Sequence, residues 1–151
     1  RRTIGSPAPV FSLESINGRT FDLSEYKDKM NVLLYFWHPY CTFCVRDYRK
    51  LAEFYREKRK EYNFVILSIA SIYGPSQQDE AEKLADEIDS VFPTLNDAES
   101  EVGNLYDIRH VPTLFVINKN GVIVDAYQGE TRNVPGRLAP VFEYISEPEE
   151  F

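Results

Sequence analysis

The sequence predicts one α/β domain in which helices cover a central β-sheet. Two apolar runs, residues 31–37 and Phe64–Ala70, have the continuous hydrophobic character of strands that are buried on both faces. Thr42–Tyr62 lies between these runs, and its apolar residues recur at the three- and four-residue spacing of a helix that packs along one face. A strand, a crossing helix and a second strand form a βαβ unit, so the two strands are expected to be parallel.

Length and charge narrow the class of protein. A chain of 151 residues is long enough for one domain with its own core, and a hydrophobic content of 43% excludes a disordered chain. We predict a single domain over residues 1–151, with a core over 5–146 and a loose acidic tail over 147–151. The net charge of −7 argues against nucleic acid as a partner.

The remaining segments supply further elements. Asn17-Gly18 lies between two short apolar segments and predicts an N-terminal β-hairpin. A second hairpin is expected around residues 118–121, and a helix capped by Ser76 is expected from residue 76 to about residue 90. Shorter helical segments are expected over 100–106 and 134–145.

The motif Cys41-Thr42-Phe43-Cys44 stands where the first buried strand gives way to the long helix. A sulfur at a helix N-terminus faces unpaired backbone N–H groups and the positive end of the helix dipole, which favour a thiolate. The two intervening residues place the second sulfur about one turn further in. This pattern predicts that Cys41 attacks a disulfide and that the recessed Cys44 resolves the mixed disulfide.

A metal site is the main alternative for these cysteines. A structural zinc site generally uses four ligands, and the sequence has no second CxxC motif. His38 and His110 could complete a Cys2His2 set only if the fold brought them to the cysteines. Both histidines are expected to be loop residues that could also modulate a thiolate, and we predict no metal and no cofactor beyond a redox-active Cys41–Cys44 disulfide.

Several motifs together resemble the TlpA/ResA-type thioredoxin-like oxidoreductases of the AhpC/TSA and redoxin-like superfamily. They are the segments 5–11 (GSPAPVF), 32–37 (VLLYFW), 41–44 (CTFC), 92–95 (FPTL), 111–113 (VPT) and 117–121 (INKNG). The resemblance covers almost the whole chain. It implies a thioredoxin fold with a central mixed sheet, an N-terminal hairpin and an αβ-type insertion over residues 72–108.

The resemblance also implies roles for individual residues. Pro112 is expected to be cis beside the CxxC motif, in a loop where Val111 and Pro112 contact the substrate. Trp37 matches an aromatic residue that shields the thioredoxin site, although a core position explains it equally well. Tyr40 stands where a tryptophan usually precedes the first cysteine, and it is expected to contact the substrate.

Asp47 matches an acid that ResA-type proteins carry near their cysteines. Its position three residues after Cys44 allows partial burial, and a carboxylate with a raised pKa could accept the proton of Cys44. The alternative is an ordinary helix acid paired with Lys50. Thioredoxin itself has a buried aspartate six residues before its first cysteine, where this chain has Tyr35.

The predicted function is exchange of disulfides with protein substrates, with the dithiol acting as a reductant. The resemblance implies an extracytoplasmic location, substrates such as apocytochrome c, and a membrane-bound or soluble electron donor. The one methionine is Met30, so a segment is expected to precede Arg1. A signal peptide or an anchor is open for that segment, and a cytoplasmic location stays open as well. A monomer is expected. A peroxiredoxin-like peroxidase, whose P-x-x-x-T-x-x-C spacing is absent, and a copper or metal carrier are the alternatives.

Overall fold

The computed structural model describes residues 3–146, and the predicted acidic tail, 147–151, lies outside the described residues. A five-stranded sheet forms the centre, with the strand order β5-β4-β3-β6-β7. Its strands are β3 (Asn31–Phe36), β4 (Phe64–Ala70), β5 (Thr94–Asn96), β6 (Thr113–Ile117) and β7 (Ile123–Gln128). The β3–β4 and β4–β5 pairs are parallel, whereas β3–β6 and β6–β7 are antiparallel, so the predicted mixed sheet is confirmed.

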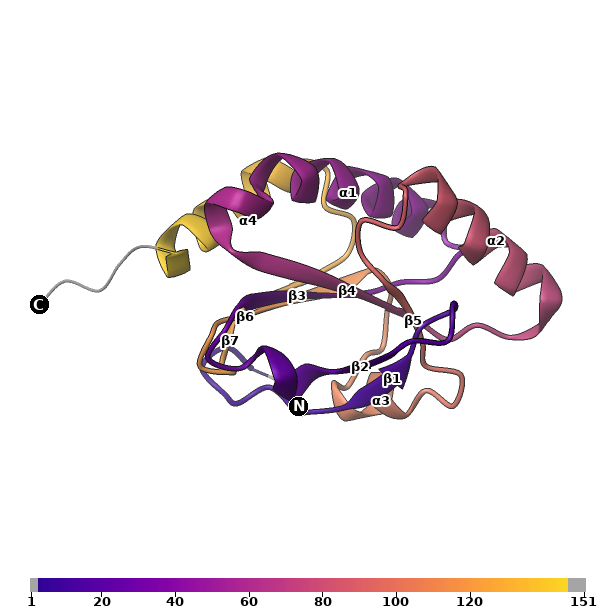
Figure 1. The fold of residues 1–151 in the computed structure, drawn as a ribbon, viewed down its shortest axis with the longest axis horizontal. Coiled ribbons are helices and arrows are strands. Elements are labelled where there is room, and N and C mark those ends of the chain that lie inside the picture. Colours follow the sequence, from indigo (N-terminus) through magenta and orange to yellow (C-terminus); the bar gives the residue numbers. More distant parts are fainter. Residues whose placement is uncertain (1–2, 147–151) are drawn as a thin grey trace, which may run out of the picture.

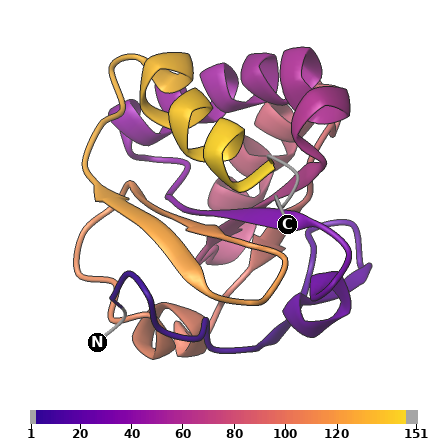
Figure 2. The same cartoon turned by 90° about the vertical axis from the view of Figure 1, so that its left-hand side faces the viewer.

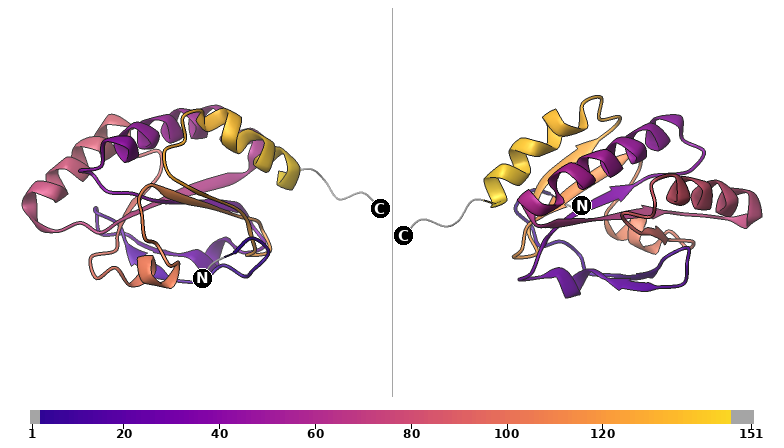
Figure 3. Two further views of the ribbon diagram at one scale, coloured as in Figure 1. Left: turned by 180° about the vertical axis from the view of Figure 1, so that it is seen from behind. Right: turned by 45° about the horizontal axis from the view of Figure 1, so that its top comes forward.

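Helices cover one face of this sheet, and the N-terminal hairpin covers part of the other (Figure 1). The covering helices are α1 (Thr42–Tyr62), α2 (Gly74–Glu87) and α4 (Val134–Ser146). Figure 3 shows α1 in the middle, with α4 on one side and α2 on the other. The opposite face carries β1 (Ser12–Glu14), β2 (Thr20–Asp22), the 3-10 helix η1 (Leu23–Tyr26) and α3 (Glu101–Leu105). The predicted hairpin and the α2–β5–α3 insertion between β4 and β6 are both present.

The start of α2 differs from the prediction. Ser76 was expected to cap this helix, but the helix begins at Gly74, its N-cap is Tyr73, and Ser76 lies inside the first turn. Pro75 favours this earlier start because a first-turn residue needs no backbone N–H donor. The side chain of Gln77, four residues further on, accepts the Tyr73 backbone N–H at 2.7 Å and so satisfies the donor of the N-cap residue.

An aromatic cluster joins α1 and α4 to the sheet. Phe142 on α4 is fully buried and lies 4.5 Å, ring centre to ring centre, from Phe64 on β4. Its ring also stacks on that of Tyr62 and packs near Phe54. Figure 2 shows α4 lying alongside α1 above the sheet. The helix that carries the cysteines is therefore held from its C-terminal half by aromatic packing.

Removing the Phe142 ring tests how much this aromatic cluster contributes to the stability of the fold. Phe142→Ala should lower the free energy of unfolding by about 3–5 kcal/mol, because it leaves a cavity among rings that cannot collapse into it. Chemical denaturation measures the difference. Tyr144→Ala, on the same helix but 79% exposed, is the control and should change stability by less than about 0.5 kcal/mol. Equal losses for the two variants would contradict the packing argument.

Candidate active site

Cys41 and Cys44 form a disulfide at the start of α1, with their Cα atoms 5.1 Å apart. Cys41 is the N-cap residue, in an extended conformation, and its sulfur accepts the backbone N–H of Cys44 at 3.2 Å. Cys41 is half-buried, whereas Cys44 has no exposed surface. The more exposed cysteine is thus the one whose sulfur a helix-end N–H group stabilises, and the buried cysteine lies one turn further along the helix.

Tyr35 on β3 lies beneath the first turn of α1. Its hydroxyl donates a hydrogen bond of 2.7 Å to the carbonyl oxygen of Cys44, and its side chain is buried. Burial and, second, the nearby Asp47 carboxyl group raise the pKa of Tyr35, so the phenol stays a neutral donor. The residue that departs from the thioredoxin pattern is therefore a hydrogen-bonding support of the cysteine turn.

Asp47 is buried on the same helix, with only 2% of its surface exposed. Its Oδ2 accepts the backbone N–H of Thr131 at 2.7 Å, and Thr131 follows β7, 84 residues along the chain. Burial is the largest cause of a raised pKa for Asp47; the nearby Glu130 raises it further, while the Thr131 hydrogen bond and Lys50 lower it. The hydrogen bond to Thr131 and the burial disagree with an exposed helix acid paired with Lys50.

Pro112 lies just before β6, next to the cysteine loop. The Val111–Pro112 peptide bond is cis. Thr113, the first residue of β6, pairs with Phe36 at the end of β3, so Pro112 stands at the same edge of the sheet as the cysteine loop. Val111 is 40% exposed and lines, together with Trp37, a cleft of about 190 Å³ beyond the ends of β3 and β4.

Trp37 and Tyr40 differ in their exposure to solvent. Trp37 is buried, and its ring lies 4.5 Å from that of Tyr48 on α1. Tyr40 is 55% exposed, and its hydroxyl donates to the Ser76 hydroxyl at 2.9 Å, which links the cysteine loop to the first turn of α2. The backbone N–H of Tyr40 donates to Nδ1 of His38 at 3.1 Å.

The basic residues nearest the motif are engaged by acids. Arg46 pairs with Glu130 at 3.0 Å, and its guanidinium lies 5.1 Å from the centre of the Phe43 ring. Arg49 forms an ion pair with Glu87 on α2. His38 and His110 both lie in loops, and the described residues contain no group of three or more His, Cys, Asp or Glu side chains that could hold a metal ion.

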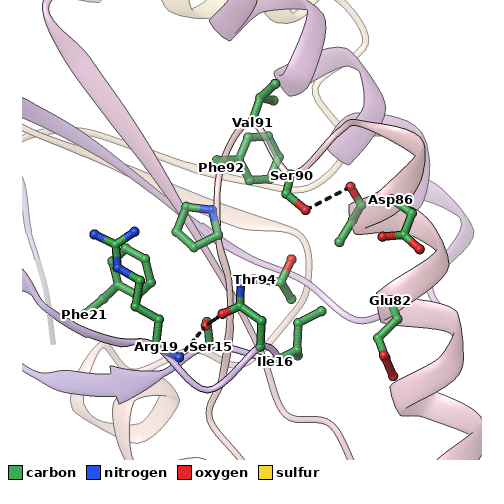
Figure 4. Close-up of a pocket in the computed structure, with 13 residues that line it drawn as sticks. Ser15, Ile16, Arg19, Phe21, Glu82, Asp86, Ser90, Val91, Phe92 and Thr94 are labelled. Carbon is green, nitrogen blue, oxygen red and sulfur yellow. Dashed lines mark hydrogen bonds between the residues drawn. The ribbon is translucent and has the colours of Figure 1, made fainter.

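A separate pocket of about 430 Å³ lies between the N-terminal hairpin and α2. Arg19 and Phe21 lie across this pocket from Glu82 and Asp86 (Figure 4). It includes Thr94, the first residue of β5, whereas Cys41 follows the last residue of β3. By strand register, Thr94 lies beside Ser68 on β4 and Ser68 lies beside Tyr35 on β3, so the pocket borders the edge strand β5, two strands away from β3, and neither cysteine lines it.

The sequence does not mark Glu130 or Thr131 as site residues, and it marks Tyr35 only as a departure from the thioredoxin pattern. Glu130 and Thr131 belong to a polar stretch after β7 and carry no motif. Their contacts with α1 follow from where β7 and α4 place the connecting loop. No local signal in the sequence marks them.

The fold and the disulfide at the start of α1 define a thioredoxin-like thiol-disulfide oxidoreductase. Residues 4–126 match the model of the AhpC/TSA family. The chain belongs to the AhpC/TSA family. Over 126 residues it is 32% identical to the thiol-disulfide oxidoreductase ResA of Geobacillus kaustophilus, covering 83% of this chain and 70% of that protein.

Other relatives agree with this class. The ResA protein of Bacillus subtilis is 30% identical over 125 residues, which cover 83% of this chain and 67% of the relative. A Chlorobium tepidum structure assigned as a thiol:disulfide interchange protein DsbE superposes with a TM-score of 0.83, at 21% identity, over 97% of this chain and all of that chain. A secreted disulfide oxidoreductase of Mycobacterium tuberculosis has a TM-score of 0.72 at 19% identity, over 86% and 95% of the two chains.

The raised pKa of Asp47 predicts how stability depends on pH. Because the folded-state pKa lies above the unfolded value, ionisation costs more in the folded protein, and stability should decline as the pH rises through the raised pKa. Asp47→Asn removes this decline while keeping an oxygen that can accept the Thr131 N–H. The decline begins at the unfolded pKa, so relative to the parent the variant should be more stable at pH 8 than at about pH 4.

Thermal unfolding of the oxidised proteins at the two pH values measures this difference. Asp79 is an exposed acid on α2. Asp79→Asn is the control, and its stability should change with pH as that of the parent does. If Asp47→Asn loses the same stability at both pH values, the carboxyl group is not the buried titrating group described above.

Proposed function

We propose that this oxidoreductase reduces disulfides of protein substrates, with Cys41 as the nucleophile and Cys44 as the resolving cysteine. The observation that carries the proposal is the asymmetry of the two sulfurs. Cys41 is half-buried and its sulfur accepts a helix-end N–H group, whereas Cys44 is fully buried. A stabilised, accessible thiolate suits attack on an external disulfide, and a buried thiol suits the internal second step.

The two steps transfer two electrons. The Cys41 thiolate attacks one sulfur of the substrate disulfide, forms a mixed disulfide and releases the first substrate thiolate. Cys44 then loses its proton, attacks the Cys41 sulfur and releases the second substrate thiolate, which leaves the Cys41–Cys44 disulfide. A dithiol electron donor, soluble or membrane-bound, returns the enzyme to its reduced form by the reverse exchange.

Asp47 is proposed as the base that accepts the Cys44 proton. It lies three residues after Cys44 on α1, and burial raises the pKa of its carboxyl group above the ordinary value. A base whose pKa is closer to that of a thiol takes the proton with a smaller penalty. Tyr35 holds the turn that joins these two residues through its bond to the Cys44 carbonyl oxygen.

Substrate contacts are proposed for the rim around Cys41. Val111 and Tyr40 are exposed, and Val111 precedes the cis peptide bond at Pro112. Trp37 lies below this rim and lines the cleft with Val111, so it would support the substrate surface from within. An extended chain bearing a disulfide could lie along this rim with one sulfur at Cys41.

An extracytoplasmic location and substrates of the apocytochrome c kind belong to the same proposal. The location is supported by the secreted Mycobacterium tuberculosis structure, whose fold this chain shares. The substrate class rests on the resemblance to TlpA/ResA-type proteins. No helix within residues 3–146 has the length and apolar character to cross a membrane. A monomer is part of the proposal.

The charges around the motif support the proposed direction of electron flow. Strong oxidants of this fold stabilise their thiolate to an unusual degree, which raises the reduction potential. Here Arg46 and Arg49, the nearest bases on α1, are each paired with a glutamate, so neither is an unpaired cation beside the thiolate. The remaining stabilisation comes from the helix start. This arrangement favours a reductant.

We therefore expect a reduction potential near about −270 mV, as for thioredoxin, rather than about −120 mV, as for DsbA. Equilibration of the protein with glutathione redox buffers, followed by alkylation and mass analysis, measures it. A potential above about −150 mV would identify an oxidant and would contradict the proposed direction.

Trapping tests the roles of the two cysteines. Cys44→Ser should accumulate a covalent mixed disulfide between Cys41 and a disulfide-bonded test peptide, because no internal thiol remains to release it. Cys41→Ser, the matched control, should trap little, because Cys44 is fully buried. Non-reducing electrophoresis counts the adducts. Equal trapping by both variants would remove the asymmetry, and trapping by neither would refute thiol exchange through Cys41.

A further inference from the structure

An ion pair on the surface connects the CxxC motif to the loop that holds Asp47. Phe43 stands between the two cysteines in the sequence, and the Arg46 guanidinium lies against its ring. Arg46 also pairs with Glu130 at 3.0 Å. Thr131, the next residue in the chain, donates its backbone N–H to Asp47 at 2.7 Å. Arg46 and Asp47 are themselves consecutive on α1. The loop after β7 is thus joined to α1 twice, once at the surface and once in the interior.

Each element near Asp47 contributes a group that affects its charge. Glu130 is a neighbouring carboxylate from the loop, and it disfavours ionisation of Asp47. Lys50 on α1 and the Thr131 N–H favour ionisation. Tyr35 on β3 is a buried phenol, Cys44 is the thiol one turn away, and Arg132, next to Thr131, is exposed. Arg46 is the cation that neutralises Glu130.

We propose that Arg46 is a positioning residue for Asp47, which it serves by anchoring the loop of Glu130 and Thr131 and by neutralising the Glu130 carboxylate. The inference rests on the proposed function, in which Asp47 accepts the Cys44 proton. Without Arg46, the loop is held by one contact fewer, and Glu130 becomes an unpaired negative charge beside Asp47. Both changes make ionisation of Asp47 harder, so they act in the same direction.

The chain offers a matched control on the same helix. Arg49 pairs with Glu87, and its side chain is exposed to nearly the same extent as that of Arg46, 48% against 51%. Its partner lies on α2, away from the loop that bonds Asp47. Arg46→Met and Arg49→Met therefore remove the same charge from the same helix, but only Arg46→Met disturbs the loop of Glu130 and Thr131.

The direct measurement is the titration of the Asp47 carboxyl carbon by NMR in the oxidised protein, which requires no turnover. The Arg46→Met variant should titrate Asp47 at higher pH than the parent, and Arg49→Met should leave the midpoint unchanged. The second measurement is the rate at which each prereduced protein reduces a disulfide-bonded test peptide between pH 5 and pH 9. Below the Asp47 midpoint, Arg46→Met should be slower by about two- to fivefold, the range expected for one surface ion pair.

The Asp47→Asn background separates this effect from a change in the Cys41 thiolate. There, adding Arg46→Met should leave the pH profile of peptide reduction unchanged. The inference is overturned if Arg46→Met leaves the Asp47 titration where it is in the parent, if Arg49→Met moves it equally, or if the rate effect persists in Asp47→Asn. A parent protein that does not reduce the peptide at any pH would refute the proposed function instead, and the NMR titration would still decide the role of Arg46.

Discussion

The position of β3 at the centre of the sheet is the constraint on which the site depends. All six residues of this strand are buried, with helices above it and the hairpin and α3 on the opposite side (Figure 1). A chain leaving such a strand reaches solvent only beyond its carboxyl end, where α1 begins and β6 enters from the opposite direction. The cysteine turn and the cis peptide bond at Pro112 therefore meet at one edge. This is the edge where α/β sheets usually place their ligands.

Charged groups near the disulfide lie both on the surface of α1 and in the interior beneath it. At the surface, the basic side of α1 is neutralised by Glu130 and Glu87. In the interior, Asp47 keeps its carboxyl group beneath the cysteine turn with one backbone N–H as its partner. Electrostatic interactions are stronger in such a buried, weakly polarisable setting than in water. The proton affinity of Asp47 is therefore sensitive to the charges of the half-buried Glu130 and the exposed Lys50.

Much of the fold could be predicted from sequence because its signals are local. The buried strands, the long helix and the hairpin each follow from the period of apolar residues or from Asn-Gly and Gly turns. The cysteine pair follows from its spacing at the start of one helix, whereas the sequence left Asp47 open between a partly buried acid and an exposed acid paired with Lys50. The bond from Thr131 to Asp47 spans 84 residues and depends on how β7 and α4 place a polar loop, so no window of sequence contains it. The cap predicted at Ser76 was wrong for a local reason. Gly74, Pro75 and Gln77 together start the helix earlier, and they outweigh the preference of one serine for the N-cap position.

Tyr35 shows how one substitution in the core rearranges the chemistry above it. At this position thioredoxin has a buried aspartate. Here the phenol of Tyr35 supports the turn through the Cys44 carbonyl oxygen, and its raised pKa keeps it neutral. Two buried carboxylates in one site would repel each other and hinder each other's ionisation. In this chain the neutral donor lies on β3 and the buried acid, Asp47, lies on α1. The pKa of Asp47 depends on Glu130 and on the hydrogen bond from the loop after β7. In the proposed mechanism, support of the cysteine turn and proton transfer therefore belong to two different side chains, Tyr35 and Asp47.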